Sequence, residues 1–397
     1  MGRKVALLLI LIPSLAFGWG AGGSSSTATV SQSSESDLTF WAPFTDPDNP
    51  LTLLKGTGTL SFTRATTATY VHPTTGLITE AASGQLRIES NGALIEGVRT
   101  NILLHSRTLN NAAWTATNMT ADNTITGEDG VANSASWVAA SADNGTICQP
   151  VTIASAAYSG AFSLKRITGT GTVMISLDNG ATYDSDVSSS LSTSAWYRAS
   201  KANQTLANPE ICLKLGTTGD NVAVDYAQVE AGVFASSRIP TTSAAVARND
   251  DLLTFALSGN VSNTVGTVAA TADSFYPDGG GGAEAHVLAG DGSGTFLYRA
   301  SSTIATWDGT SGVLGGTWND AASHNFSASW GGSSRSIVQN GGTVVTGGFD
   351  GDLNHLATIY IGRTSTGAAN YYLFGHIKNI RIWNRALTDA EMVSITQ

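Results

Sequence analysis

Short segments in which apolar and polar residues alternate, separated by turn residues, run through the chain from Leu38 almost to its end. Residues 211–215 (ICLKL) and 222–227 (VAVDYA) show the pattern clearly. Successive side chains on a strand point to opposite faces, so this period predicts strands with one buried and one solvated face. Helical periodicity is confined to the C-terminal end. The sequence therefore predicts an all-β fold of β-sandwich type, closed by one short helix.

Hairpin turns are marked along the chain by Asn-Gly pairs at 144–145, 179–180 and 340–341. Type I′ turns need a positive φ at both central residues, which Asn and Gly tolerate, so each pair predicts a hairpin. Charged residues make up 13% of the chain, against about 25% in ordinary globular domains. The solvated faces must therefore consist largely of Ser, Thr, Asn and Gly. With 42% apolar residues, the chain can bury a core and is not expected to be disordered.

The formal net charge is −10, and no cluster of Lys and Arg stands out. Neither nucleic acid nor an anionic membrane surface is therefore an expected partner. Cys148 and Cys212 are the only cysteines, too few to make a zinc site by themselves. They can form one disulfide bond or remain two buried thiols, and the sequence leaves both possibilities open.

The first residues have the pattern of an export signal. Arg3 and Lys4 precede a nearly continuous apolar run over 5–17, and Ala16 and Gly18 offer a cleavage site. The run is shorter than the roughly 20 residues that a membrane-spanning helix needs. We expect a signal peptide at 1–18 and a Gly/Ser linker at 19–37. The mature protein is then expected to be extracellular or on a virion surface, with no membrane insertion.

Three blocks are expected after the linker. A boundary is predicted near 240–252, where residues 239–242 (IPTT) close one block and the polar stretch 243–251 opens the next. This gives an N-terminal β segment at 38–100, a jelly roll at 101–242 and a second jelly roll at 250–397, in tandem. At the end of the chain, Thr388 and Glu391 form a capping box, with Leu387 and Met392 as its hydrophobic staple. A short helix should start there.

Residues near the C-terminus resemble the closing motif of laminin-G-like and concanavalin A-like jelly rolls. The matching stretches are 359–362 (IYIG) and 374–388 (FGHIKNIRIWNRALT), which follow that family's glycine-flanked strand and its N-R-A-L ending. The resemblance implies a sandwich fold for the last block. Because the family includes lectins, glycan hydrolases and adhesion modules, it does not specify the activity.

Two more resemblances come from the first half of the chain. Residues 224–232 (VDYAQVEAG) and 236–241 (SSRIPT) resemble the ending of jelly-roll carbohydrate-binding modules. In those modules the Asp at the position of Asp225 often ligates a structural calcium ion, and a half-exposed strand residue is the alternative. Residues 62–70 (FTRATTATY) and 97–103 (GVRTNIL) resemble a segment of phage tail and fibre proteins. This segment followed by two sandwiches is an order typical of tailed-phage virion proteins.

The sequence lacks the common catalytic motifs. G-x-S-x-G, H-E-x-x-H and P-loop patterns are absent, and the 6 His are scattered without ligand spacing. The E-x-D-x-x-E strand of concanavalin-like glycoside hydrolases is absent as well. Asp350 and Asp352 flank a glycine in a turn-like run, where solvated turn residues are expected and a loop acid pair or calcium ligand is the alternative. We therefore expect a protein that is not an enzyme.

Aromatic residues of the last block are the best candidates for a binding site, because a planar ring covers the apolar face of a sugar at small entropic cost. Trp307-Asp308 and Trp318-Asn319 lie in turn-like contexts. Tyr371 follows a loop and can edge the same surface. The predicted carbohydrate-binding residues are therefore Trp307, Asp308, Trp318, Asn319 and Tyr371, with core packing as the alternative for the indoles. Asp225 is the predicted ligand of a structural calcium ion.

These observations favour a non-catalytic protein that binds a cell-surface polysaccharide or other glycan, as part of a phage or prophage tail fibre or virion surface. One stacked ring binds weakly, so useful affinity would need several copies, as in a trimeric fibre. A secreted concanavalin-like glycoside hydrolase and a purely structural virion or envelope protein are the alternatives.

Overall fold

The computed structural model describes residues 37–276, 284–292, 294–367 and 371–397. The expected signal peptide and nearly all of the expected linker lie outside these residues. Within them the fold is all-β, as predicted, and its helical parts are the short C-terminal helix α2 (Asp389–Ile395) and the 3-10 turn η1 (Ser188–Ser190). None of the helices in the described ranges is long and apolar enough to span a bilayer.

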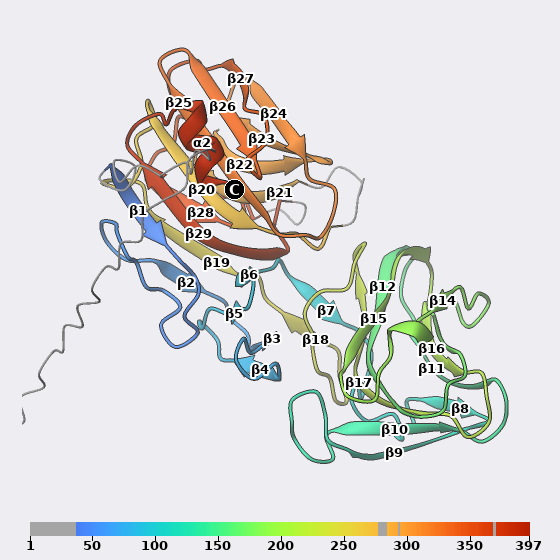
Figure 1. Ribbon diagram of the computed structural model, residues 1–397. Coiled ribbons are helices and arrows are strands. Elements are labelled where there is room, and N and C mark those ends of the chain that lie inside the picture. The colour runs from blue at the N-terminus through green and yellow to red at the C-terminus, as the bar shows by residue number, and fades with distance from the viewer. Residues whose placement is uncertain (1–36, 277–283, 293, 368–370) are drawn as a thin grey trace, which may run out of the picture.

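The larger module is a sandwich of two sheets (Figure 1). The eight-stranded sheet has the order β27 (Val345–Gly348), β26 (Ser334–Gln339), β25 (His324–Gly331), β20 (Gly266–Ala272), β29 (Gly375–Trp383), β6 (Gly92–Ile95) and β5 (Ile88–Glu89), with β1 (Leu38–Ala42) also paired to β29. The seven-stranded sheet has the order β2 (Ser61–Thr63), β19 (Leu252–Ala256), β28 (Thr358–Ile361), β21 (Ala285–Gly290), β22 (Thr295–Ala300), β23 (Thr303–Trp307) and β24 (Gly312–Thr317). Their inner faces share one core, to which Phe326 and Ile377 contribute from the first sheet and Val287 and Ile359 from the second.

The N-terminal segment is part of this sandwich and not a block of its own. β1 and β6 pair with successive parts of β29, β6 with residues 375–377 and β1 with residues 380–383. β2 pairs with β19. Phe40 of β1 stacks on Phe255 of β19 with ring centroids 4.1 Å apart. The first jelly roll is therefore inserted into a sandwich whose strands come from both ends of the chain.

The inserted module is a smaller sandwich with its own core, which includes Val138, Phe162 and Leu213. One five-stranded sheet has the order β15 (Tyr197–Leu206), β12 (Ala156–Thr168), β17 (Asn221–Ala231), β10 (Ala135–Ala140) and β9 (Met119–Ile125). The other has the order β14 (Ser185–Asp186), β13 (Val173–Ser176), β16 (Glu210–Leu215), β11 (Gly145–Pro150) and β8 (Thr115–Thr117). Cys148 and Cys212 face each other on β11 and β16 and form a disulfide bond, which decides the choice that the sequence left open.

A two-stranded ribbon carries the chain into the inserted module and back. β7 (Arg99–Asn101) pairs with β18 (Val246–Arg248), and Figure 1 shows both strands between the two sandwiches. The hairpin of β3 (Ala68–Val71) and β4 (Ile78–Ala81) is part of the N-terminal segment and lies near the ribbon. The boundary predicted near 240–252 thus contains the returning strand.

Two of the three Asn-Gly pairs have the predicted turn geometry. Asn179-Gly180 and Asn340-Gly341 have positive φ at both residues, in the connections β13–β14 and β26–β27. The hairpin predicted at 144–145 is wrong: Asn144 has a φ of 59°, but Gly145 starts β11, which lies in a different sheet from β10. The turn therefore carries the chain across the sandwich. At the C-terminus the predicted capping box of Thr388 and Glu391 is confirmed.

Candidate functional site

Trp318 lies in the core and not on the surface. Its side chain is 0% exposed. The ring centroid is 4.8 Å from that of Phe326, and the Arg299 guanidinium carbon lies 5.4 Å from the indole. The turn-like residues that suggested exposure come after the indole, and the first of them, Asn319, is indeed exposed. A fully buried ring cannot stack on a sugar, so the prediction that Trp318 contacts a ligand is wrong.

Trp307 lies at the end of β23 on the outer face of the seven-stranded sheet, the face opposite to the core. Its neighbour Thr306 pairs with Val313, a core residue, and directly paired residues share a face. Since side chains alternate along a strand, Trp307 must point the other way, together with Leu314, which is 56% exposed. The indole is half-buried. Trp307 is therefore the predicted tryptophan that is open to solvent.

Other aromatic rings share this outer face. Tyr298 pairs with Ala305, two residues before Trp307 on β23, and His286 pairs in turn with Tyr298. The His286 and Tyr298 rings stack with centroids 5.2 Å apart. Tyr371 meets His286 edge-on at 5.4 Å. We call His286, Tyr298, Trp307 and Tyr371 the outer aromatic row; the sequence singled out Trp307 and Tyr371, but not the two rings between them.

The outer aromatic row combines buried and accessible rings. His286 and Tyr298 are 4% and 9% exposed, whereas Trp307 and Tyr371 are half-buried. The Glu284 carboxylate, beside the row, accepts a hydrogen bond from Nε2 of His286 at 2.9 Å. Burial raises the pKa of the Tyr298 hydroxyl, so it stays a neutral group that can donate a hydrogen bond. His286 thus contacts both Tyr298 and Tyr371, and Trp307 lies two residues after Ala305, the partner of Tyr298 on β23.

Asp308 holds a turn and does not face a ligand. Its side chain is buried and accepts hydrogen bonds from the amides of Thr310 and Ser311, at 2.8 and 2.7 Å. Arg335 lies 3.3 Å away. Burial alone would raise the pKa of Asp308, but these amides and the guanidinium bring it below its ordinary value. The prediction that Asp308 binds sugar directly is therefore wrong; it fixes the turn that follows Trp307.

Asp225 is also engaged by protein groups. Arg107 donates to both carboxylate oxygens, at 2.7 and 3.0 Å, and the amides of Glu128 and Tyr226 donate at 2.9 Å each. A calcium ion needs carboxylate oxygens that are free to face it. These are occupied, so the predicted role of Asp225 as a calcium ligand does not fit the residues around it. The positively charged guanidinium of Arg107 occupies the position beside the Asp225 carboxylate that a calcium ion would need.

Ion pairs gather where the inserted module meets the larger sandwich, a feature that the sequence did not reveal. Arg87 pairs with Glu96 at 2.7 Å and with Asp251 at 2.5 Å. Arg64 pairs with Asp251 and Arg248 with Glu96, at 2.9 Å each, and none of the five side chains is more than 1% exposed. We call these residues the junction network. Residues 62–70, which resemble phage proteins, meet residues 236–241, which resemble carbohydrate-binding modules, beside this network, where Thr69 donates a hydrogen bond to the carbonyl of Arg238.

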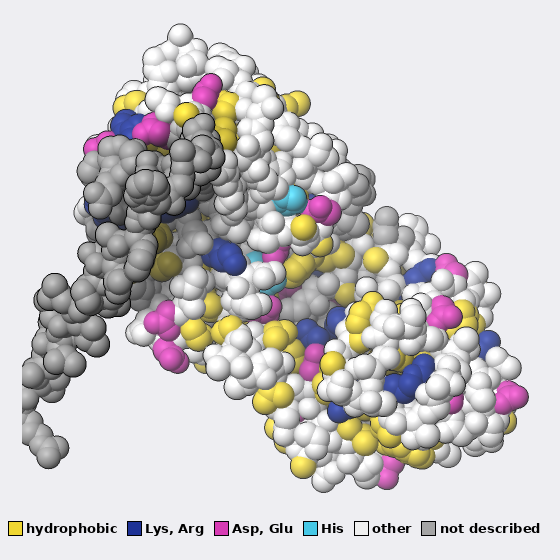
Figure 2. All heavy atoms as spheres, viewed as in Figure 1, with side chains coloured by type: hydrophobic (Ala, Val, Ile, Leu, Met, Phe, Trp, Pro, Cys, Tyr) yellow, Lys and Arg dark blue, Asp and Glu magenta, His cyan; other side chains and the backbone are white. Residues whose placement is uncertain are grey.

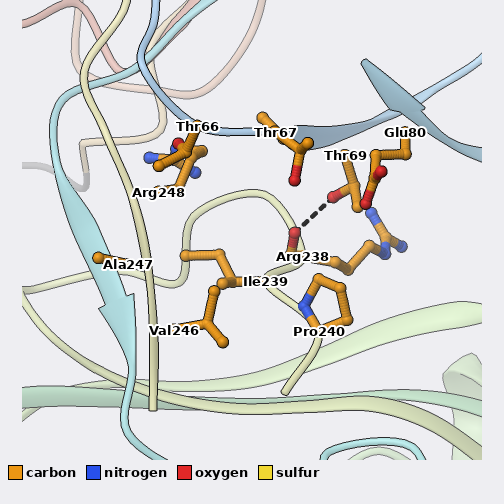
Figure 3. Close-up of a pocket in the computed structure, with 11 residues that line it drawn as sticks. Thr66, Thr67, Thr69, Glu80, Arg238, Ile239, Pro240, Val246, Ala247 and Arg248 are labelled. Carbon is orange, nitrogen blue, oxygen red and sulfur yellow. Dashed lines mark hydrogen bonds between the residues drawn. The ribbon is translucent and has the colours of Figure 1, made fainter. Parts of the chain in front are cut away.

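A cavity of about 350 Å³ lies beside the junction network (Figure 3). Threonines of the β3 region, including Thr67 and Thr69, lie on one side, and Ile239, Pro240 and Val246 on the other. Thr69 donates a hydrogen bond to the carbonyl of Arg238 across it. Figure 2 shows basic and acidic side chains along the hollow between the two modules. The junction is therefore hollowed and charged, unlike most of the surface.

Comparisons with known proteins found only distant likenesses. No family model and no curated protein matches the chain. A solved Trypanosoma rangeli sialidase is 17% identical with a TM-score of 0.28, covering 36% of this chain. The chain spans 25% of that sialidase. Domains LG4-5 of the mouse laminin alpha1 chain are 9% identical with a TM-score of 0.26, covering 62% of this chain and 90% of that one. Such scores do not bear on function, which must be inferred from this chain's own residues.

Proposed function

We propose that the protein is a non-catalytic glycan-binding protein that acts outside the cell, with the outer aromatic row as its sugar-contacting surface. The observation that carries the proposal is the half-buried Trp307 on the outer face of the sheet, next to a turn fixed by Asp308. An accessible indole held rigidly can stack on a sugar ring without losing much entropy. Tyr371 and the exposed amide of Asn319 add polar groups to the same module.

The absence of catalysis is part of the proposal. Glycoside hydrolysis needs two carboxyl groups that flank the scissile bond. Of the acidic residues near the row, Asp308 is occupied by turn amides and Glu284 by His286. Both arrangements suit a binding surface better than an acid and a nucleophile. Release of reducing ends from a bound polysaccharide would favour the hydrolase alternative.

The finer assignment, to a tail fibre or virion surface of a phage or prophage, rests on the resemblance of residues 62–70 and 97–103 and on the two sandwiches that accompany this segment. In such a fibre several copies, for example three, would multiply a weak single-site affinity. Export through the N-terminal signal, with an extracellular location, belongs to the same proposal. Size measurement in solution and the N-terminal sequence of the secreted protein test these two points.

Trp307→Ala is expected to weaken binding to a recognised glycan several-fold. One stacked ring contributes about 0.5–1.5 kcal/mol beyond the burial of its area, which corresponds to about a 2- to 12-fold loss. The fold should be kept, because the indole is half-buried and lies outside the core. Glycan-array screening followed by titration of the best glycan measures the effect.

Trp196→Ala is the matched control. Trp196 is also half-buried, lies on the inserted module and contacts Lys165, whose amine is 5.0 Å from the ring. Its removal should leave glycan affinity unchanged. Equal losses of glycan affinity in the two variants, or no loss in Trp307→Ala, would mean that the outer aromatic row does not contact the glycan.

A further inference from the structure

A second cavity, of about 170 Å³, lies between the inserted module and the larger sandwich. Its walls include Arg198, Ser236 and Arg238 from the inserted module and Glu89, Leu94 and Phe275 from the sandwich. A volume of this size holds several water molecules, or one carboxyl group with part of its carrier. Arg238 lines both this cavity and the larger one of Figure 3.

Arg198 has only neutral acceptors around its guanidinium. It donates to the carbonyl of Tyr226 at 2.6 Å and to the side-chain oxygen of Gln228 at 3.2 Å. Its Nε is buried without a hydrogen-bond partner. In the described parts of the chain, no carboxylate oxygen lies within 4.0 Å of it. A partly buried cation in this position lacks the counter-ion that would offset its desolvation.

The other arginine of the cavity wall, Arg107 and the arginines of the junction network are paired. Arg238 itself pairs with Glu128, donating at 2.9 Å from Nε. Arg107 pairs with Asp225, and the three arginines of the junction network pair with Glu96 and Asp251. Arg198 differs from them all. Burial and the nearby charge of Arg238 lower the pKa of Arg198 to about 9. The carboxylates of Glu128, Glu230 and Asp225 act in the opposite direction but do not offset this.

The remaining walls limit what such an anion can be. Phe275 and Leu94 are apolar, and the hydroxyl of Ser236 is directed at Glu230. Glu89 is held by His376 at 3.0 Å, and its carboxylate can still accept a hydrogen bond from a ligand hydroxyl. Glu89 would repel a doubly charged phosphate more strongly than a group with a single negative charge. A ligand with one carboxylate, hydroxyls and an apolar ring face therefore fits these walls best.

We propose that this cavity binds the carboxylate of an acidic sugar, such as a uronic acid, with Arg198 as its counter-ion. A planar guanidinium matches the geometry of a carboxylate and makes strong charge-assisted hydrogen bonds to it. That the carrier is a sugar rests on the proposed function, whereas the carboxylate is inferred from Arg198 alone. The cavity is formed by both modules, so its ligand would also bind them together.

Titration of the full chain with D-glucuronate, its methyl ester and D-glucose, followed by NMR, tests the proposal. D-glucuronate should bind, and the ester and D-glucose, which have no carboxylate, should bind at least about tenfold more weakly. Arg198→Gln should weaken D-glucuronate binding by a similar factor. Ala235→Trp keeps the guanidinium but fills the cavity, so it should also weaken D-glucuronate binding. It tests the proposal if Arg198→Gln does not fold. Arg385→Gln, in a partly exposed ion pair, is the matched control.

Equal affinity for D-glucuronate and its methyl ester would overturn the role of the carboxylate. Binding that survives both Arg198→Gln and Ala235→Trp would place the ligand elsewhere. Trp307→Ala separates the two proposals: it should leave D-glucuronate binding intact. If it abolishes that binding while Arg198→Gln does not, the acidic sugar lies on the outer aromatic row, and the cavity proposal fails although the proposed function stands.

Discussion

Arg87→Met is expected to lower the free energy of unfolding by about 3–5 kcal/mol, because it leaves buried carboxylates without their shared cation. Arg87 is fully buried and donates to both Glu96 and Asp251. Methionine fills much of the volume but offers no donor. The remaining cations, Arg64 and Arg248, each reach only one of the two carboxylates. Urea denaturation followed by tryptophan fluorescence measures the loss.

Arg385→Met provides the matched control. Arg385 pairs with Glu391, but the two side chains are 31% and 23% exposed. Water and salt screen such a pair, so its loss should cost less than about 1 kcal/mol. Similar losses in the two variants would mean that the junction network is hydrated in solution.

The junction network should also make the stability of the protein depend on pH. Burial would raise the pKa of Glu96, but Arg248 and Arg87 lower it from 4.5 to about 2. A carboxyl group whose pKa is lower in the folded state stabilises the fold fully above pH 4.5. That stabilisation is lost as the pH falls from 4.5 towards 2. Removing Arg87 weakens the effect, so the acid unfolding midpoint of Arg87→Met should lie at a higher pH than that of the parent protein.

The local features of the fold were predictable because each depends on a few consecutive residues. The capping box of Thr388 and Glu391 and the turn at Asn340-Gly341 are set by backbone geometry that the sequence shows directly. The all-β class follows from alternation. That alternation is misleading in β17, where Asp225, Gln228 and Glu230 lie on the second face and are buried as well. Arg107 and Ser236 contact this face, and no pattern within the strand reports a cover supplied by another segment.

The long-range arrangement could not be read from the sequence. β1 pairs with β29, so Ala42 lies opposite Ile380, and nothing near either residue specifies the other. The same holds for the junction network, in which Arg64 meets Asp251 across the inserted module. Isolated charged residues look solvated in a sequence, and only the fold shows that these neutralise one another inside the protein.

Only part of the candidate site could be predicted, because side-chain direction also depends on long-range pairing. Trp307 and Trp318 both stand next to Asp or Asn residues that favour turns. The register of β23 with β24 directs Trp307 outward, while Trp318 comes after the end of β24 and turns inward onto Phe326. Side-chain direction depends on pairing with a neighbouring strand, so local context cannot separate the two indoles.

Trp318→Ala is therefore expected to behave unlike Trp307→Ala. Truncation of a fully buried tryptophan costs about 3–5 kcal/mol, through lost burial and the cavity that remains. The ring packs on Phe326 and lies beside Arg299, so its loss also exposes buried groups to a void. Thermal and urea denaturation of the two variants should show a large loss for Trp318→Ala and a small one for Trp307→Ala. Folded Trp318→Ala should keep its glycan affinity. The reverse result, a stable Trp318→Ala that no longer binds, would mean that Trp318 contacts the sugar and is not a core residue.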